Sequence, residues 1–248
     1  MPPSVVPEPS GSARPLILFA LTDTRVVDVV GGMLREQGHE VRQTADGPAT
    51  RQALREREPQ GVVLSLELPR CDPWQFLQDL RDQARAMPIV VVAPVYIEVD
   101  AARAYRSGAD DYLTYGISRE QGLPRVAARF RRLLPSSGAS GPGAGAPGPA
   151  GPRGIVVDRA TRVARANGTP LDLTPLEFDL LAAFVARPEQ VLGQGWLLGE
   201  VWGESENADP RRVKYAVLRL RRKIAEATGG RTGIATVRGV GYRYHRID

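Results

Sequence analysis

Cysteine and histidine are almost missing from this chain. Its 248 residues include one cysteine, Cys71, and two histidines, His39 and His245. A single thiol can neither close a disulfide within the chain nor build a thiolate metal cluster, and two histidines so far apart suggest no shared metal site. The composition fits a reducing compartment, and we expect no metal and no cofactor.

Long apolar runs are missing as well. The sequence contains no stretch of about 18 consecutive apolar residues, so we expect no membrane span. Its first residues, MPPSVVPEPSGSARP, have neither the basic start nor the apolar centre of a secretion signal. It also has no phosphate-binding glycine loop, no cluster of metal ligands and no paired nucleophile and base. These absences predict a cytoplasmic protein that is not an enzyme and has no catalytic residue.

Lysine is missing from the first 213 residues, since the first lysine is Lys214. Residues 15–134 carry 16 basic and 16 acidic side chains, whereas residues 135–248 carry 16 basic and 11 acidic ones. Between residues 210 and 246 there are 11 basic residues and a single acid, Glu226. This local excess indicates a polyanionic partner, and the alternative is a solvated basic surface.

Charged and large apolar residues are absent between residues 135 and 152, where the sequence is PSSGASGPGAGAPGPAGP. Such a segment cannot bury a core and is typical of a flexible linker. The alternative is a disordered insertion within one domain. Residues 1–14 are predicted to be a disordered tail. The chain is thus expected to hold one domain over residues 15–134 and a second over residues 153–248.

The first domain alternates short apolar runs with amphipathic segments. The pattern predicts strands at 16–21, 39–43, 61–66, 89–92 and 111–114, and helices at 25–37, 48–57, 73–84, 100–107 and 118–134. Continuous apolar strands that alternate with helices predict an α/β domain, a doubly wound parallel sheet covered on both faces. In such sheets a functional crevice lies at the carboxyl ends of the strands.

The second domain has a different pattern, which predicts a mixed α+β fold. Strands are expected at 154–158, 162–166, 171–173, 234–238 and 241–244, and helices at 175–187, 196–202 and from about 210 to 227. Thr174 and Glu177 have the spacing of a capping box before the first helix. Asp209 followed by proline predicts a similar start for the third helix. The last two strands are expected to form a hairpin.

The third helix has two contrasting faces. Val213, Val217, Leu220 and Ile224 recur at intervals of four, three and four residues, which predicts one buried stripe. The rest of its surface is cationic, and no acid occurs between residues 211 and 225. A helix with one anchored face and a cationic outer face fits the major groove of DNA. The alternative, a solvated basic helix, usually carries interspersed acids.

The residues predicted to contact double-stranded DNA, at a promoter or operator, lie on this helix and on the closing hairpin. On the helix they are Arg211, Arg212, Lys214, Tyr215, Leu218, Arg219, Arg221 and Arg222. Arginine suits guanine or phosphate, and Tyr215 and Leu218 suit thymine methyl groups. The hairpin adds Arg238, Arg243 and Arg246, as expected for a wing over the DNA backbone or minor groove. An ordinary edge hairpin is the alternative there.

Four segments of the second domain carry a specific pattern: LDLTPLEFDLLAAFVARPEQVL, EVWG, RRVKYAVLRLRRKI and TVRGVGYRY. They resemble the effector domain of OmpR/PhoB-type response regulators. The resemblance implies a winged helix-turn-helix after a four-stranded sheet, with the recognition helix at 211–222 and Arg238 in the wing. It also implies that residues 203–208 contact RNA polymerase and that a homodimer binds direct repeats. GQGWLL at 193–198 departs from the family, which usually has a serine cap there.

The first domain resembles the receiver of the same family in PQGVVLSLELP, MPIVVVAP and SGADDYL. A receiver needs paired acids for Mg²⁺, an acceptor aspartate, a hydroxyl group and a lysine. By local motif, the acidic pair falls on Leu21 and Thr22 with Asp23 one place late, the acceptor on Ser65, the hydroxyl on Ala93 and the lysine on Tyr115. We therefore predict a pseudo-receiver and a transcription regulator that acts independently of aspartyl phosphorylation.

The resemblance also identifies a dimer face and leaves alternatives open. Asp110, Asp111, Arg125 and Arg132 match charged positions of the family's dimer face. One alternative is a ligand-sensing regulator that binds a small molecule in the degenerate crevice. Another is a protein-interaction adaptor. A third is a phosphorylation site in a shifted register that uses the carboxylates of Asp23, Glu67 and Asp72.

Overall fold

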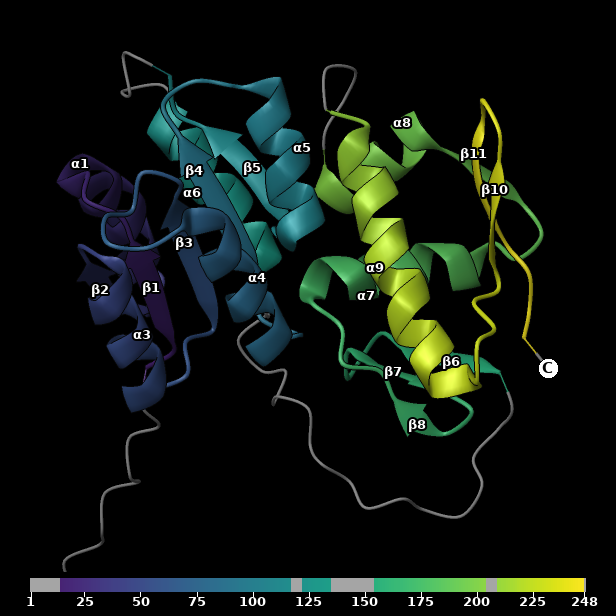
Figure 1. Ribbon diagram of the computed structural model, residues 1–248. Helices are drawn as coiled ribbons and strands as arrows, with labels where there is room; N and C mark the ends of the chain where they lie inside the picture. Colours follow the sequence, from purple (N-terminus) through teal and green to yellow (C-terminus); the bar gives the residue numbers. More distant parts are fainter. Residues whose placement is uncertain (1–13, 117–121, 135–153, 204–208, 248) are drawn as a thin grey trace, which may run out of the picture.

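The computed structural model describes residues 14–116, 122–134, 154–203 and 209–247 (Figure 1). Residues 1–13 of the predicted tail and the whole predicted linker lie outside these ranges. In Figure 1 the receiver-like part and the C-terminal part lie side by side, and α5 of the first faces α9 of the second. Within the described ranges, no helix has both the length and the apolar surface that a membrane crossing requires.

A five-stranded parallel sheet forms the centre of the receiver-like part, in the order β2-β1-β3-β4-β5. The strands are β1 (Leu16–Ala20), β2 (Glu40–Thr44), β3 (Gly61–Ser65), β4 (Ile89–Ala93) and β5 (Asp111–Thr114). All five residues of β1 are buried, and so are the first four of β3 and of β4. This burial is the reason that their sequences are continuous apolar runs.

Helices cover both faces of this sheet. They are α1 (Thr24–Val26), the π-helical turn η1 (Val27–Gly31), α2 (Gly32–Glu36), α3 (Gly47–Glu56), α4 (Pro73–Gln83), α5 (Glu98–Ser107) and α6 (Gly122–Leu133). Phe19 of β1 shares a core with Phe130 of α6, whereas its neighbour Leu18 shares the opposite core with Phe76 of α4. Side chains thus alternate between two cores along β1, β3 and β4, and the predicted doubly wound fold is confirmed.

The C-terminal part has two small antiparallel sheets around three helical segments. Its elements are β6 (Ile155–Asp158), β7 (Val163–Ala166), β8 (Thr169–Pro170), α7 (Pro175–Ala186), β9 (Val191–Gly193), α8 (Gln194–Leu197), the π-helical turn η2 (Leu198–Trp202), α9 (Arg211–Thr228), β10 (Ile234–Val237) and β11 (Gly241–Tyr244). The strand orders are β6-β7-β8 and β10-β11-β9. This is the predicted winged-helix arrangement, with α9 packed on α7 and next to the hairpin.

Helix starts follow the predicted signals in part. Thr174 Oγ1 accepts a hydrogen bond from the Glu177 amide, and the Glu177 carboxylate accepts one from the Thr174 amide, so the capping box is confirmed. At α9, Asp209 Oδ1 accepts a hydrogen bond from the Arg211 amide at 2.9 Å. The start of α8 at Gly193 has no side-chain cap, in keeping with the missing serine.

Three details of the C-terminal part differ from the sequence prediction. Residues 171–173 are not a strand: the Leu171 amide still donates to the carbonyl oxygen of Ala164 in β7 at 2.9 Å, and the chain then continues to the start of α7. The first sheet accordingly has three strands, not four, within the described ranges. β9 was not predicted, because three residues are too few to show an alternation; it pairs with β11 and joins the hairpin to the helices.

Candidate functional site

The apolar stripe of α9 fixes the helix to its own domain. Val213, Val217, Leu220 and Ile224 are all fully buried, as predicted, and α9 packs against α7 through this side. The outer surface of α9 is therefore held in a fixed orientation. Leu218 is 60% exposed on that surface, and Lys214 and Arg222 are also exposed.

A second side of α9 does not face solvent, contrary to the prediction of a freely exposed cationic face. Arg212 and Arg219 are each only 8% exposed, because they lie against the receiver-like part. Burying a guanidinium group without partners costs several kcal/mol, so each needs acceptors inside the contact. The receiver supplies them at the end of α5 and the start of β5.

Arg212 binds two receiver side chains. Its Nε donates a hydrogen bond to the Tyr105 hydroxyl at 2.8 Å and lies 3.1 Å from Asp111 Oδ1. The second oxygen of Asp111 accepts a hydrogen bond from Arg129 at 3.0 Å. Burial raises the pKa of Tyr105 well above its ordinary value, and the nearby Asp111 carboxylate raises it further. The phenol therefore stays neutral, and its oxygen accepts the hydrogen bond from the guanidinium group.

Arg219 connects three parts of the molecule. Its Nη2 lies 3.1 Å from Asp110 Oδ1, and its Nη1 donates to the carbonyl oxygen of Ala109 at 3.0 Å. Its Nε donates to Glu177 of α7 at 3.1 Å. The other oxygen of Asp110 accepts a hydrogen bond from Arg81 at 2.7 Å. Arg219 thus links the recognition helix to both the receiver and α7.

Glu177 is fully buried below this contact. Lys223 Nζ donates to its carboxylate at 2.6 Å and to the carbonyl oxygen of Arg85, a receiver residue, at 2.8 Å. Burial by itself would raise the pKa of Glu177, but the positive charges of Lys223, Arg219 and Arg81 outweigh it and hold the pKa at about 2. Glu177 is therefore ionised at neutral pH.

The edge of the contact is formed by exposed pairs. Arg211 Nη1 donates to Glu98 Oε1 at 2.8 Å, and Tyr96 donates its hydroxyl proton to Asp209 at 2.6 Å. Tyr215 of α9 stacks on Tyr105 of the receiver, with ring centroids 6.3 Å apart and planes at 24°. Four of the eight residues of α9 that were predicted to contact DNA thus bind the receiver-like part instead. They are Arg211, Arg212, Tyr215 and Arg219.

The remaining predicted DNA contacts stay accessible or join the hairpin. Arg221 Nε donates to the carbonyl oxygen of Ile234 and its Nη2 to Thr236, so it links α9 to β10. Arg238 is exposed at the tip of the hairpin, and Arg243 is partly buried. The described molecule thus presents the wing and one side of α9, while the receiver covers the other side.

The carboxyl ends of the parallel strands bring the predicted phosphorylation positions together. In the sheet register Ala20 pairs with Leu64, just before Leu21 and Ser65, and Ala93 pairs with Thr114, just before Tyr115. Leu21 and Tyr115 are buried in the same apolar core, and Ser65 Oγ accepts a hydrogen bond from the Glu67 amide at 3.1 Å. These positions thus carry apolar or neutral side chains, and two of them are core residues.

The nearby carboxylates act as helix caps. Asp23 accepts a hydrogen bond from the Arg25 amide at the start of α1, and Asp72 accepts two from Trp74 and Gln75 at the start of α4. Thr22 and Glu67 are exposed. Within the described ranges, no group of three acidic, histidine or cysteine side chains could hold a metal ion.

The four residues predicted for the dimer face lie in two environments. Asp110 and Asp111 are 2% and 1% exposed and pair inside the chain, as described above. Arg125 and Arg132 are exposed on α6, and Arg132 Nη1 donates to the Trp202 carbonyl oxygen at 3.4 Å. The acidic half of the predicted dimer face is therefore engaged by the recognition helix in this structure.

Three residues of the contact were not predicted as functional. Tyr105 and Arg81 were assigned only to helices, and Glu177 only to a capping box. The signal that was available is the adjacent pair Asp110-Asp111 at the start of β5, directly before Tyr112 and Leu113. Two adjacent acids cannot both point into a core without cationic partners, which the sequence offers in excess on α9.

Comparisons with known proteins agree with both parts of the fold. Residues 17–127 match the family described as "Response regulator receiver domain", and residues 168–244 match "Transcriptional regulatory protein, C terminal". The DNA-binding response regulator MtrA of Mycobacterium tuberculosis is 34% identical over 233 residues, 93% of this chain and 96% of MtrA. The transcriptional regulatory protein AfsQ1 of Streptomyces coelicolor is 33% identical over 229 residues, 92% of this chain and 97% of AfsQ1.

Solved structures also match over most of the chain. A cysteine-to-serine mutant of RitR matches with a TM-score of 0.61 and 20% identity, and the match covers 93% of this chain and 99% of RitR. At that identity the likeness concerns the fold alone. Of the relatives of higher identity, MtrA is a DNA-binding response regulator and AfsQ1 is a transcriptional regulatory protein. From the receiver sheet, the winged helix and these relatives together, the chain belongs to the OmpR/PhoB family of response regulators and is a DNA-binding transcriptional regulator.

Proposed function

We propose that this response regulator binds operator DNA without aspartyl phosphorylation of its receiver. The observation that carries the proposal is the set of side chains at the carboxyl edge of the sheet. Leu21, Ser65, Ala93 and Tyr115 stand there. Phosphoryl transfer to a receiver needs clustered acids for Mg²⁺, a carboxylate acceptor and a cation opposite the developing charge.

The receiver-like part has no residue at the expected positions that meets any of these three requirements. Ser65 offers a neutral hydroxyl, which is a weak nucleophile unless a base removes its proton. Its neighbour Glu67 supplies a backbone amide to Ser65 Oγ, and the Glu67 side chain is exposed. Lys214 is the first lysine of the chain and lies on the recognition helix, so no lysine of the receiver can bind a phosphoryl oxygen.

DNA binding is assigned to α9 and the wing. The proposed contacts are the predicted residues Arg211, Arg212, Lys214, Tyr215, Leu218, Arg219, Arg221, Arg222, Arg238 and Arg243. Because the receiver binds Arg212 and Arg219, full insertion of α9 into a major groove requires the two parts to separate. The equilibrium between the closed arrangement and a separated one then sets the affinity for DNA.

The assembly on DNA is proposed from the family membership. Two protomers bind direct repeats about one helical turn apart. Residues 203–208 contact RNA polymerase, and the protein acts in the cytoplasm. Asp110 and Asp111 are released when α9 leaves the receiver, and they then become available for the dimer face together with Arg125 and Arg132. The segment at 204–208 lies outside the described ranges.

The test is treatment of the full chain with acetyl phosphate and Mg²⁺, beside a response regulator with an intact receiver. We expect an unchanged intact mass and unchanged affinity for operator DNA, while the parallel protein gains one phosphate. A hydroxylamine-labile phosphate that tightens DNA binding contradicts the proposal. A hydroxylamine-stable phosphate on Ser65, added by a kinase of another type, leaves the claim about aspartyl phosphorylation standing.

A further inference from the structure

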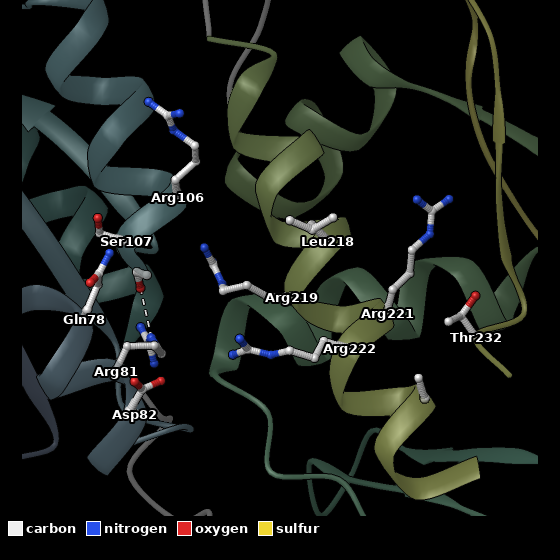
Figure 2. Close-up of a pocket in the computed structure, with 12 residues that line it drawn as sticks. Gln78, Arg81, Asp82, Arg106, Ser107, Leu218, Arg219, Arg221, Arg222 and Thr232 are labelled. Carbon is white, nitrogen blue, oxygen red and sulfur yellow. Dashed lines mark hydrogen bonds between the residues drawn. The ribbon is translucent and has the colours of Figure 1, made fainter. Parts of the chain in front are cut away.

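A groove with a volume of about 620 Å³ lies between the receiver and the recognition helix. Figure 2 shows Arg219 and Arg222 extending from α9 toward the receiver, with Arg81 and Ser107 on the opposite side. The volume is in the range of sites that bind small molecules. Because the walls come from both parts of the chain, the groove exists only while the parts are in contact.

Positive charge dominates the lining of the groove. Among its twelve lining residues are five arginines, and Asp82 is the one acid of that set. Arg81 and Arg219 are compensated by buried carboxylates below the groove, as described above. Arg222 is 56% exposed, and its one acidic neighbour in the described ranges is Glu226, at 4.0 Å and itself 49% exposed. At that separation an exposed pair attracts weakly.

Arg106 supplies a further cation from the receiver side. Its Nε donates to the carbonyl oxygen of Ala102 in its own helix at 3.4 Å, and within the described residues its two terminal nitrogens have no protein acceptor. In Figure 2 its guanidinium group stands at the rim of the groove, along α5. Arginine binds phosphate and carboxylate through two parallel hydrogen bonds, so an arginine on each wall suits a ligand with several anionic groups.

The groove also has neutral walls. Leu218 contributes an apolar surface that is 60% exposed, and Ser107 and Gln78 contribute a hydroxyl and an amide. A single inorganic anion would fill little of this space. The lining fits a molecule whose anionic groups reach arginines on both walls and whose remainder lies against Leu218.

We propose that this groove binds a small polyanion, a molecule with two or more phosphate or carboxylate groups, and that the bound molecule holds the recognition helix on the receiver. The effect on DNA rests on the proposed function. A ligand that binds only the closed arrangement stabilises it, and DNA that needs α9 free is then bound less tightly. The site is distinct from the degenerate phosphorylation crevice, which lies at the ends of the parallel strands.

The first experiment measures binding without DNA. The full chain is titrated with inorganic tripolyphosphate in a calorimeter, and separately with citrate, at a fixed ionic strength set with sodium chloride. We expect saturable binding of one molecule per chain by at least one of the two probes, and Arg106→Gln should raise its Kd about tenfold, as expected for the loss of one charge-assisted contact. Arg103→Gln is the matched control, because Arg103 is exposed on the same helix but stacks on Trp74 outside the groove.

The second experiment measures DNA affinity with and without the better probe. The probe should weaken operator binding by the wild-type chain and by Arg103→Gln, and much less by Arg106→Gln, whose affinity without the probe should equal that of the wild type. Equal weakening in all three proteins overturns the inference, because the probe then competes for the basic surface. Absence of saturable binding in the first experiment also overturns it. A chain that binds the probe but no DNA contradicts only the proposed function.

Discussion

Arg219 of the recognition helix and Asp110 of the receiver meet at 3.1 Å with their side chains 9% and 1% exposed. An arginine expected to bind DNA is thus paired with an aspartate expected at a dimer face, inside one chain. Buried ion pairs are costly to break from one side, because the remaining charge stays unpaired. The closed arrangement therefore buries both the predicted DNA-contacting side of α9 and the acidic half of the predicted dimer face, and separation of the two parts would expose both.

Substitution of Tyr105 by phenylalanine should favour the open form. The change removes the hydroxyl oxygen that accepts a hydrogen bond from Arg212 Nε at 2.8 Å, and it keeps the ring that stacks on Tyr215. A lost hydrogen bond of this kind costs about 0.5–1.5 kcal/mol, so DNA affinity should rise about two- to tenfold while the closed form predominates. Fluorescence anisotropy with labelled operator DNA measures the change.

The control is Tyr112→Phe, because the buried hydroxyl of Tyr112 has no hydrogen-bond partner among the described residues. This variant should bind DNA as the wild type does. If Tyr105→Phe binds DNA no more tightly than Tyr112→Phe, the receiver does not compete with DNA.

A comparison of Arg222→Ala with Arg219→Ala should distinguish a residue that contacts only DNA from one that also holds α9 on the receiver. Arg222 is 56% exposed, so its loss should leave the thermal midpoint unchanged, cost about 1–3 kcal/mol of DNA affinity and relax specificity at one base pair. Arg219→Ala should also lower the thermal midpoint, because Asp110 and Glu177 each lose a buried partner.

Salt should weaken DNA binding by the wild type in proportion to the phosphates it neutralises. With about 5–8 phosphates per bound unit, log K should fall with log salt concentration with a slope of about 0.9 per phosphate. Binding isotherms at several salt concentrations measure the slope, on operator and on scrambled duplex. Equal affinity for the two duplexes at every salt concentration would show that the binding is not sequence-specific.

Acid should destabilise the protein through Glu177. Its pKa is about 2 when folded, compared with 4.5 as the ordinary value. The unfolded chain therefore binds this proton at a higher pH, so the stabilisation is complete above about pH 4.5 and is lost as pH falls toward 2. Protonation of Glu177 should therefore lower the free energy of unfolding. Urea unfolding between pH 2 and 6 measures it, and Glu177→Gln should show a shallower pH dependence over that interval.

Restoring the acceptor alone should not restore phosphorylation. Ser65→Asp places a carboxylate at the end of β3, but Leu21, Ala93 and Tyr115 still provide no metal ligand, hydroxyl or lysine. Acetyl phosphate with Mg²⁺ should leave the intact mass of this variant unchanged. A mass gain of one phosphate would show that a carboxylate at this position is sufficient.

Footprints on operator DNA should cover two half-sites about 10–10.5 bp apart at saturating protein. Direct repeats are expected, because the uncharged linker predicted at 135–152 does not impose receiver symmetry on the DNA-binding domains. Protection of one half-site alone at saturation contradicts this arrangement.

The sequence predicted the fold well because its signals are local. The apolar runs of β1, β3 and β4 and the stripe from Val213 to Ile224 each reflect burial within one element or one core. The sequence did not reveal the pairing of Arg212 and Arg219 with the receiver. That pairing joins residues about 100 positions apart, and an arginine suited to DNA phosphate is equally suited to an aspartate.

The smaller errors have similar physical causes. β9 is three residues long and is a strand because it pairs with β11, so its own sequence pattern does not predict it. The stretch 171–173 has an apolar pattern, but the capping of α7 at Thr174 takes the chain out of the sheet. At β9 a tertiary contact outweighs local preference, and at 171–173 the start of the following helix does.

The carboxylates of Asp110 and Asp111 bind Arg219 and Arg212, two of the arginines that we propose as DNA contacts. Because both acids belong to the same chain as α9, dilution of the protein does not weaken their competition with DNA. A regulator that is open one time in ten binds its operator about tenfold more weakly than its recognition helix alone would allow. Under the proposed equilibrium, occupancy of a promoter depends on how strongly the receiver holds α9, so a change within the receiver alters transcription without touching any base pair.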